Sequence, residues 1–161
     1  EIDLDITVGT PSEDLLTLAK YYQKSGAASA LTGEKKIEVD LSEQKMLIKV
    51  GDVVLMEYRI SSGKAATPTP TGNFKILFKN DVRISGQGTP YIMPNYMGFA
   101  GGGAYGMHAL PSLSYDNGYF WTEALNHIGI PVSHGCIRLL PEDAKSLYDF
   151  SEIGTKVEVY F

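Results

Sequence analysis

The stretch IEVDLSEQKMLIKVGDVVLMEYRIS, residues 37–61, decides the fold expected of this chain. Apolar and polar residues alternate in its first two segments, where the apolar positions are Ile37, Val39, Leu41, Met46, Ile48 and Val50. A period of two places alternate side chains on one face of a β-strand. Short turns, SEQK and then Gly51-Asp52, separate the segments. The stretch therefore predicts three strands joined as an antiparallel meander.

The rest of the chain adds further strands and one helix. Strands are expected over NFKILF (73–78) and over the closing VEVYF (157–161). Residues 85–106 are rich in glycine and also hold two prolines, so no long regular element is expected there. The segment after Pro141 has helical spacing of apolar residues and ends at Gly154. The predicted fold class is mostly β, with β-sandwich-like mixed sheets and one helix packed on them.

The N-terminal segment, residues 1–35, lies outside this pattern. Thr10 and Glu13 form a capping box with Pro11 at the first helical position, which predicts a short helix. We expect residues 1–35 to be a helical appendage or linker and residues 36–161 to be the main domain. The chain begins at Glu1 rather than Met, so we expect it to be a processed product. A signal peptide or a membrane anchor could have preceded it before processing.

Composition excludes several classes of protein. The 161 residues suffice for one domain with its own core. The formal net charge of −5 argues against a nucleic-acid partner. No apolar run approaches the roughly 20 residues that span a bilayer. A single cysteine excludes an internal disulfide framework and a multi-cysteine metal site, and we expect neither a metal nor another cofactor.

The single cysteine, Cys136, lies in PVSHGCIRLLPEDAKSLY, residues 131–148. A nearby base or positive charge turns a thiol into a nucleophile. Several suitable residues lie close in sequence: His108, His127, His134 and Arg138. A lone cysteine in a globular domain is, however, most often a small buried apolar residue. From the residues alone, both interpretations of Cys136 stay open.

Four segments of the chain resemble the L,D-transpeptidase catalytic domain, the YkuD-type family. They are the opening strand pair, the S-x-G-K turn and TPxG loop in SSGKAATPTPTG, the motif SHGCIR preceded by YGMH, and the closing GTKVEVYF. The resemblance covers about residues 36–161. It implies that family's mostly β fold, with a helix beside the catalytic cysteine.

The resemblance also implies an activity. Such enzymes cleave the bond between an L- and a D-centre in a peptidoglycan stem tetrapeptide and release the terminal D-Ala. The acyl group is held as a thioester until an amine of a second stem takes it, which gives a 3→3 cross-link. The expected partners are therefore peptidoglycan stem peptides, with carbapenem β-lactams as inhibitors. The expected location is extracytoplasmic, in the cell wall or periplasm.

By position in the motif, the resemblance makes Cys136 the nucleophile and His108 the base. The carbonyl of Ala109 would orient the imidazole. The N–H groups of Gly135 and Cys136, with His134 beside them, would form the oxyanion hole. Arg138 would bind a substrate carboxylate, and further substrate contacts are expected from Ser133, Tyr96 and Met97, with Tyr91 in the same groove wall.

Two features depart from the family pattern. The segment between His108 and Ser133 is longer than usual, and we expect the excess to be a loop over the mouth of the site, outside the central sheet. The alternative is that His127, rather than His108, is the base. Arg138 stands where many members of the family carry Asn, which affects substrate choice but not the reaction class.

Three other functions remain open at this point. Water in place of the amine acceptor would make the protein an L,D-carboxypeptidase. The second alternative is a zinc site with three histidine ligands, His108, His127 and His134, although their spacing matches no common zinc motif. A non-catalytic wall-binding module would keep the same fold.

Overall fold

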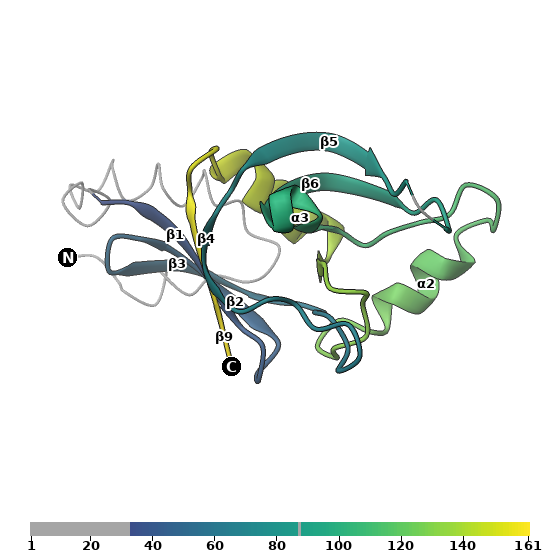
Figure 1. The fold of residues 1–161 in the computed structure, drawn as a ribbon, viewed down its shortest axis with the longest axis horizontal. Coiled ribbons are helices and arrows are strands. Elements are labelled where there is room, and N and C mark those ends of the chain that lie inside the picture. The colour runs from purple at the N-terminus through teal and green to yellow at the C-terminus, as the bar shows by residue number, and fades with distance from the viewer. Residues whose placement is uncertain (1–32, 87) are drawn as a thin grey trace.

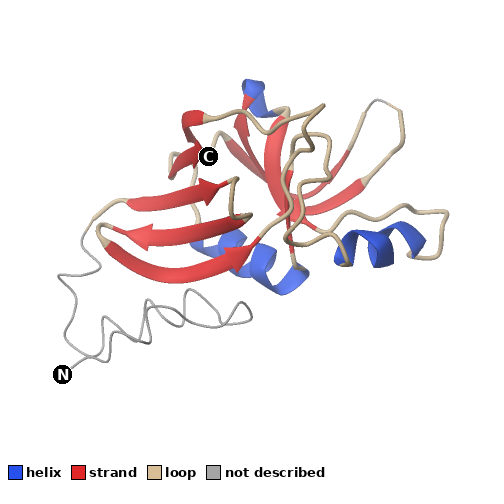
Figure 2. Ribbon diagram, turned by 90° about the horizontal axis from the view of Figure 1, so that it is seen from below, coloured by secondary structure: helices blue, strands red, loops and turns tan. Residues whose placement is uncertain are grey.

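The computed structural model describes residues 33–86 and 88–161. The helix expected in the N-terminal segment lies outside the described residues. Two sheets and the helices that border them make up the described part (Figures 1 and 2). No helix among the described residues is both long enough and apolar enough to cross a membrane.

The first sheet has five strands in the order β3-β2-β1-β9-β4. They are β1 (Lys35–Asp40), β2 (Lys45–Val50), β3 (Val53–Arg59), β4 (Gly72–Lys75) and β9 (Lys156–Tyr160). Strands β1 to β3 form the expected antiparallel meander, and the closing strand β9 pairs in parallel with β1. Ile37 of β1 is fully buried, whereas its neighbour Glu38 forms an ion pair with Lys49 at 2.9 Å.

The second sheet has the order β5-β6-β7-β8. Its strands are β5 (Phe78–Ile84), β6 (Ile92–Ala100), β7 (Tyr105–Ala109) and β8 (Ile137–Leu139), with the one-turn helix η3 (Gly101–Gly103) between β6 and β7. Strands β7 and β8 are parallel, and the other pairs are antiparallel. Both sheets are therefore mixed.

Two expectations about strands were wrong. The segment 73–78 is not one strand, because the chain leaves the first sheet after β4 and enters the second at β5, with Ile76 buried at the crossing. Residues 85–106 do hold a long strand, β6. Its Pro94 is tolerated because β6 pairs only with β5 there; β7 joins β6 from Met97 onward.

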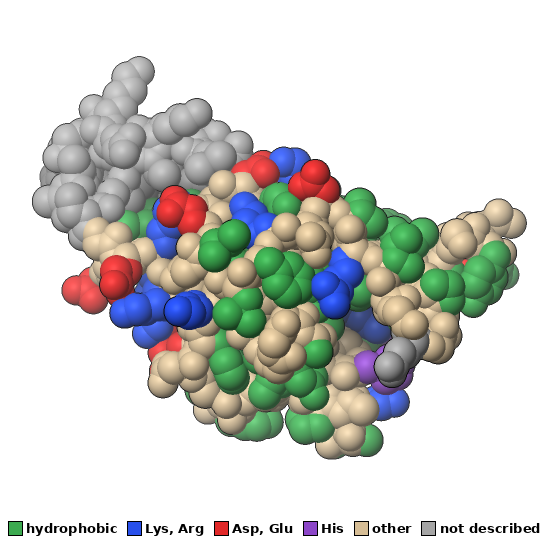
Figure 3. All heavy atoms as spheres, turned by 45° about the horizontal axis from the view of Figure 1, so that its top comes forward, with side chains coloured by type: hydrophobic (Ala, Val, Ile, Leu, Met, Phe, Trp, Pro, Cys, Tyr) green, Lys and Arg blue, Asp and Glu red, His purple; other side chains and the backbone are tan. Residues whose placement is uncertain are grey.

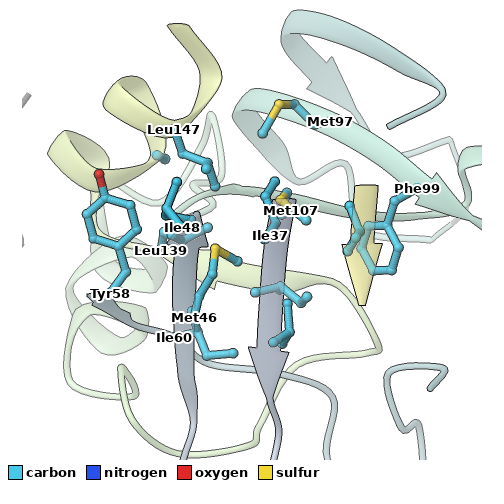
Figure 4. Packing of buried hydrophobic residues seen from close by; sticks show 14 of the residues in the cluster. Ile37, Met46, Ile48, Tyr58, Ile60, Met97, Phe99, Met107, Leu139 and Leu147 are labelled. Carbon is cyan, nitrogen blue, oxygen red and sulfur yellow. The ribbon is translucent and has the colours of Figure 1, made fainter. Parts of the chain in front are cut away.

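The core fills the space between the two sheets and the helix α3 (Pro141–Phe150), which packs on β6 and β7 (Figure 4). Aliphatic and methionine side chains from both sheets meet there, among them Met46, Ile48, Met107 and Leu147. The predicted fold class, mostly β with mixed sheets and a helix beside the cysteine segment, is confirmed.

One carboxylate is buried in the first turn of α3. Asp143 is 1% exposed, and neither of its carboxylate oxygens has a hydrogen-bond partner among the described residues. Burial, with a smaller effect of the adjacent Glu142, raises the pKa of Asp143 to about 7. The folded state thus holds a proton that the unfolded state releases near its ordinary pKa. The resulting stabilisation is present at low pH and is lost as the pH rises through about 7.

Replacing Asp143 by Asn is expected to remove this pH dependence. The free energy of unfolding of the unmodified protein should fall as the pH rises from about 4 to about 7, and Asp143→Asn should flatten that fall. Urea unfolding at a series of pH values measures how the free energy of unfolding depends on pH. Glu142→Gln, which removes an exposed carboxylate of the same turn, is the control. Equal slopes for Asp143→Asn and the unmodified protein would contradict the assignment.

Candidate active site

A cavity of about 670 Å³ opens on the second sheet. Most of the residues expected from the sequence to form a site line it: Tyr91, Tyr96, His108, Ser133, His134, Cys136 and Arg138. A larger hollow of about 900 Å³ lies over β1, β9 and β4, but it is lined by charged and apolar side chains without a histidine or cysteine. The smaller cavity is therefore the candidate site.

Pairing of β7 with β8 brings the chemical groups together. His108 of β7 is the register partner of Arg138 of β8, and Cys136 stands two residues before Arg138. In a parallel pair, register partners and residues two apart share a face of the sheet. The sheet thus places imidazole, guanidinium and thiol on the same side, at the wall of the cavity.

The imidazole of His108 is held in one tautomer. Its Nδ1 lies 2.6 Å from the carbonyl oxygen of Ala109, which only accepts, so Nδ1 carries the proton and Nε2 keeps a free lone pair. The ring also stacks on Tyr96, with centroids 5.8 Å apart. Desolvation lowers the pKa of His108 to about 4, although the Ala109 carbonyl opposes the shift and Arg138 adds to it. The ring is therefore neutral at pH 7 and able to accept a proton.

The thiol of Cys136 is also kept neutral by burial, which raises its pKa. Several groups oppose that shift: the backbone of Gly106, the hydroxyl of Tyr96, and the charges of Arg138 and Arg83. All of them favour the thiolate once the proton leaves. The surroundings of Cys136 thus suit a thiol that loses its proton only when a base takes it.

The turn that carries the cysteine is closed by Ser133. Its Oγ donates to the carbonyl of Cys136 at 2.5 Å and accepts from the N–H of Gly135 at 3.1 Å. Gly135 has a φ of 125°, and a Cβ there would lie 2.6 Å from a ring atom of Tyr105, so only glycine fits. The Gly135 N–H is therefore engaged within the turn. Of the two N–H groups expected to stabilise an oxyanion, that of Cys136 has no hydrogen-bond partner among the described residues.

The TPxG loop supports this turn from the side, a role that sequence reasoning missed. Thr69 Oγ1 accepts from the N–H of Gly63 at 3.0 Å and donates to the carbonyl of Gly135 at 2.8 Å. Thr67 Oγ1 donates to the carbonyl of Ser133 at 3.0 Å. Both threonines lie in SSGKAATPTPTG, a segment that the sequence analysis used only as evidence of the family resemblance.

Tyr96 and Met97 are adjacent on β6 and so point to opposite faces. Tyr96 lines the cavity, and its hydroxyl donates to the carbonyl of Gly103 at 2.7 Å. Met97 is 1% exposed and lies in the core near Met107 (Figure 4). The structure therefore removes Met97 from the set of expected substrate contacts, because strand alternation turns it away from the cavity.

The other two histidines differ in position. His134 is exposed at the cavity, with its ring centroid 6.4 Å from that of Tyr91. A histidine is visible beside basic side chains on the face drawn in Figure 3. His127 lies in the turn after α2 (Tyr119–Leu125), where its N–H donates to Ala124, and it does not line the cavity. Within residues 33–86 and 88–161, no group of three His, Cys, Asp or Glu residues is placed to hold a metal ion.

The segment between His108 and Ser133 was expected to be a loop, and this was wrong in part, because it contains the helix α2. It does lie outside both sheets and beside the site. Phe120 of α2 packs on Tyr91, with centroids 5.0 Å apart, and its ring lies 5.6 Å from the guanidinium of Arg138. Of this segment only Pro111 lines the cavity, whereas α2 packs against two lining residues, Tyr91 and Arg138.

The cavity thus brings a neutral imidazole, a half-buried thiol and a guanidinium to one face of a mostly β fold. The sequence profile of the L,D-transpeptidase catalytic domain matches residues 34–159. The chain therefore belongs to the L,D-transpeptidase catalytic domain family.

Individual relatives agree with this assignment. YciB of Bacillus subtilis, which bears the name of an L,D-transpeptidase, is 32% identical over 126 residues, covering 76% of this chain and 64% of YciB. An L,D-transpeptidase structure from Mycobacterium smegmatis superposes with a TM-score of 0.67 at 26% identity, over 80% of this chain and 59% of that one. The L,D-transpeptidase LdtMt1 in complex with imipenem shares the fold, with a TM-score of 0.66 at 22% identity, over 78% of this chain and 58% of that one. The chain thus spans less than two thirds of the length of these relatives.

The protonation of His108 can be measured directly. In a ¹⁵N-resolved NMR titration its ring should stay neutral down to about pH 4, with the proton on Nδ1, because burial disfavours the charged form. Cys136→Ala, titrated in parallel, keeps the Ala109 hydrogen bond and should show the same tautomer. A midpoint near the ordinary histidine value of about 6.5 would contradict the buried, neutral base.

The support that Thr69 gives to the cysteine turn predicts a loss of reactivity. Thr69→Val keeps the shape of the side chain but leaves the Gly63 N–H and the Gly135 carbonyl without their partner. We expect a loss of about 1–3 kcal/mol in stability and slower alkylation of Cys136 by iodoacetamide. Thr71→Val, at an exposed position of the same loop, is the control. If both variants behave alike, the hydrogen bonds of Thr69 do not hold the turn.

Proposed function

We propose that this protein is a peptidoglycan L,D-transpeptidase with Cys136 as its nucleophile. The observation that carries the proposal is the pairing, in one cavity, of the chain's only thiol with a neutral imidazole whose Nδ1 is fixed on the Ala109 carbonyl. This is the arrangement of a nucleophile, its base and an orienting group. Membership of the L,D-transpeptidase family supports the substrate class.

The first half of the reaction forms a thioester. Nε2 of His108 takes the proton of Cys136 as the sulfur attacks the carbonyl between the L-centre and the terminal D-Ala. The N–H of Cys136 faces the developing oxyanion, with His134 beside it. When the tetrahedral intermediate collapses, His108 returns the proton to the departing amine of D-Ala. The acyl group then remains on Cys136.

The second half transfers the acyl group to an amine of another stem. Neutral His108 takes a proton from the attacking amine, the sulfur leaves, and the product is a 3→3 cross-link. The proton then returns to the thiolate, so the enzyme ends as it began. Since stem peptides are assembled into the wall outside the membrane, we place the activity in the cell wall or periplasm.

A β-lactam ring presents the same target as the scissile amide, a carbonyl whose C–N bond opens under attack by sulfur. LdtMt1 has been solved in complex with imipenem, and L,D-transpeptidase 3 from Mycobacterium tuberculosis with a faropenem-derived adduct. We therefore expect a carbapenem to acylate Cys136 of this protein.

Intact-mass spectrometry tests this expectation. One drug mass should add per chain, and none should add to Cys136→Ala. Cys136→Ser should also fail, because a hydroxyl is far harder to deprotonate than a thiol. His108→Ala should slow the reaction by about 10²–10⁴-fold, the usual effect of a positioned base.

His127→Ala is the matched control and should change the rate little, since His127 does not line the cavity. An adduct on Cys136→Ala, or a larger effect of His127→Ala than of His108→Ala, would contradict the mechanism. Incubation with a stem tetrapeptide and an amine, followed by product analysis, separates the transpeptidase from a carboxypeptidase that uses water.

A further inference from the structure

The candidate active site contains a second arginine that the family motif does not include. Arg83 of β5 lines the same cavity as Cys136 and Arg138. Of the chain's arginines, Arg59, Arg83 and Arg138, two thus face one cavity.

The position of Arg83 is fixed by aromatic rings. Its guanidinium carbon lies 4.9 Å from the ring centroid of Tyr96 and 5.3 Å from that of Phe78. Tyr96 in turn stacks on His108. Stacking on aromatic faces is typical of guanidinium groups and leaves their edge free for hydrogen bonds.

Neither arginine of the cavity is neutralised. All ion pairs among the described residues use lysine, so no carboxylate of residues 33–86 or 88–161 pairs with Arg83 or Arg138. The lining of the cavity contains no Asp or Glu at all. Two unpaired guanidinium groups and no acid make a site for a ligand with two negative charges.

The two arginines differ in their position relative to Cys136. Arg138 is two residues from Cys136 and is the register partner of His108, whereas Arg83 belongs to β5, at the other edge of the sheet from β8. In the proposed donor peptide, the D-Ala carboxylate is close to the scissile bond. Where the acyl residue is diaminopimelate, the usual one in donors of this family, a second carboxylate stands further away, at the end of its side chain. Arg138 therefore suits the first carboxylate and Arg83 the second.

We propose that Arg83 binds a second carboxylate, on the acyl side of the scissile bond, and so makes the enzyme selective for donors in which that group is free rather than amidated. The inference rests on the proposed function and specifies its donor. The guanidinium donates charge-assisted hydrogen bonds to a carboxylate, whereas a carboxamide is neutral and brings N–H donors that Arg83 cannot accept.

Two tetrapeptides, alike except for a carboxylate or a carboxamide at that position, test the proposal. The unmodified protein should release D-Ala from the free-acid peptide with a kcat/KM about ten- to hundredfold higher than from the amide. Arg83→Gln should reduce this ratio to about one by slowing only the free-acid peptide. Arg83→Lys should keep part of the preference, and Arg59→Gln, at an exposed position outside the cavity, should keep all of it.

Binding to the Cys136→Ala protein, measured by calorimetry, separates this proposal from the reaction itself. There the free-acid peptide should bind more tightly than the amide, and Arg83→Gln should abolish the difference. The proposal is overturned if the preference is absent in the unmodified protein or survives in Arg83→Gln. Selective binding without D-Ala release by the unmodified protein would overturn the proposed reaction and leave the role of Arg83 standing.

Discussion

The site depends on one backbone position that only glycine can occupy, Gly135. Its φ of 125° directs the chain so that Cys136 enters the cavity and β8 follows at once. Because a side chain at this position would collide with Tyr105, the conformation is open only to glycine. Hydrogen bonds from Ser133 within the turn and from Thr69 outside it hold the conformation. The cysteine turn and the TPxG loop therefore act as a single hydrogen-bonded unit, although they are far apart in sequence.

Burial sets the protonation states of Cys136 and His108. Desolvation raises the pKa of Cys136 and lowers that of His108, so thiol and imidazole are both neutral before substrate arrives. In the proposed mechanism, removal of the proton from sulfur is therefore part of the reaction rather than a step completed in advance. Arg83 and Arg138 favour the thiolate, and they give an otherwise acidic protein a cationic cavity.

Sequence patterns were sufficient where local periodicity decides the outcome. The meander, the closing strand and the helix after Pro141 follow from apolar spacing and turn residues, and the structure contains all three. Long-range pairing could not be predicted in the same way. Strand β6 forms in a glycine-rich segment because β5 and β7 supply its hydrogen bonds. The chain crosses between the sheets near Ile76, so that β4 is an edge strand of the first sheet and β5 an edge strand of the second.

The sequence by itself determined the family, the single thiol and the three candidate bases among the histidines, because these depend on residue identity in short motifs. Only the tertiary structure decided which groups face the cavity. It brings His108 beside Arg138 through β7 and β8, turns Met97 into the core, and adds Arg83 from another strand. These positions depend on strand register and on hydrogen bonds between distant segments, and spacing along the chain does not encode either one.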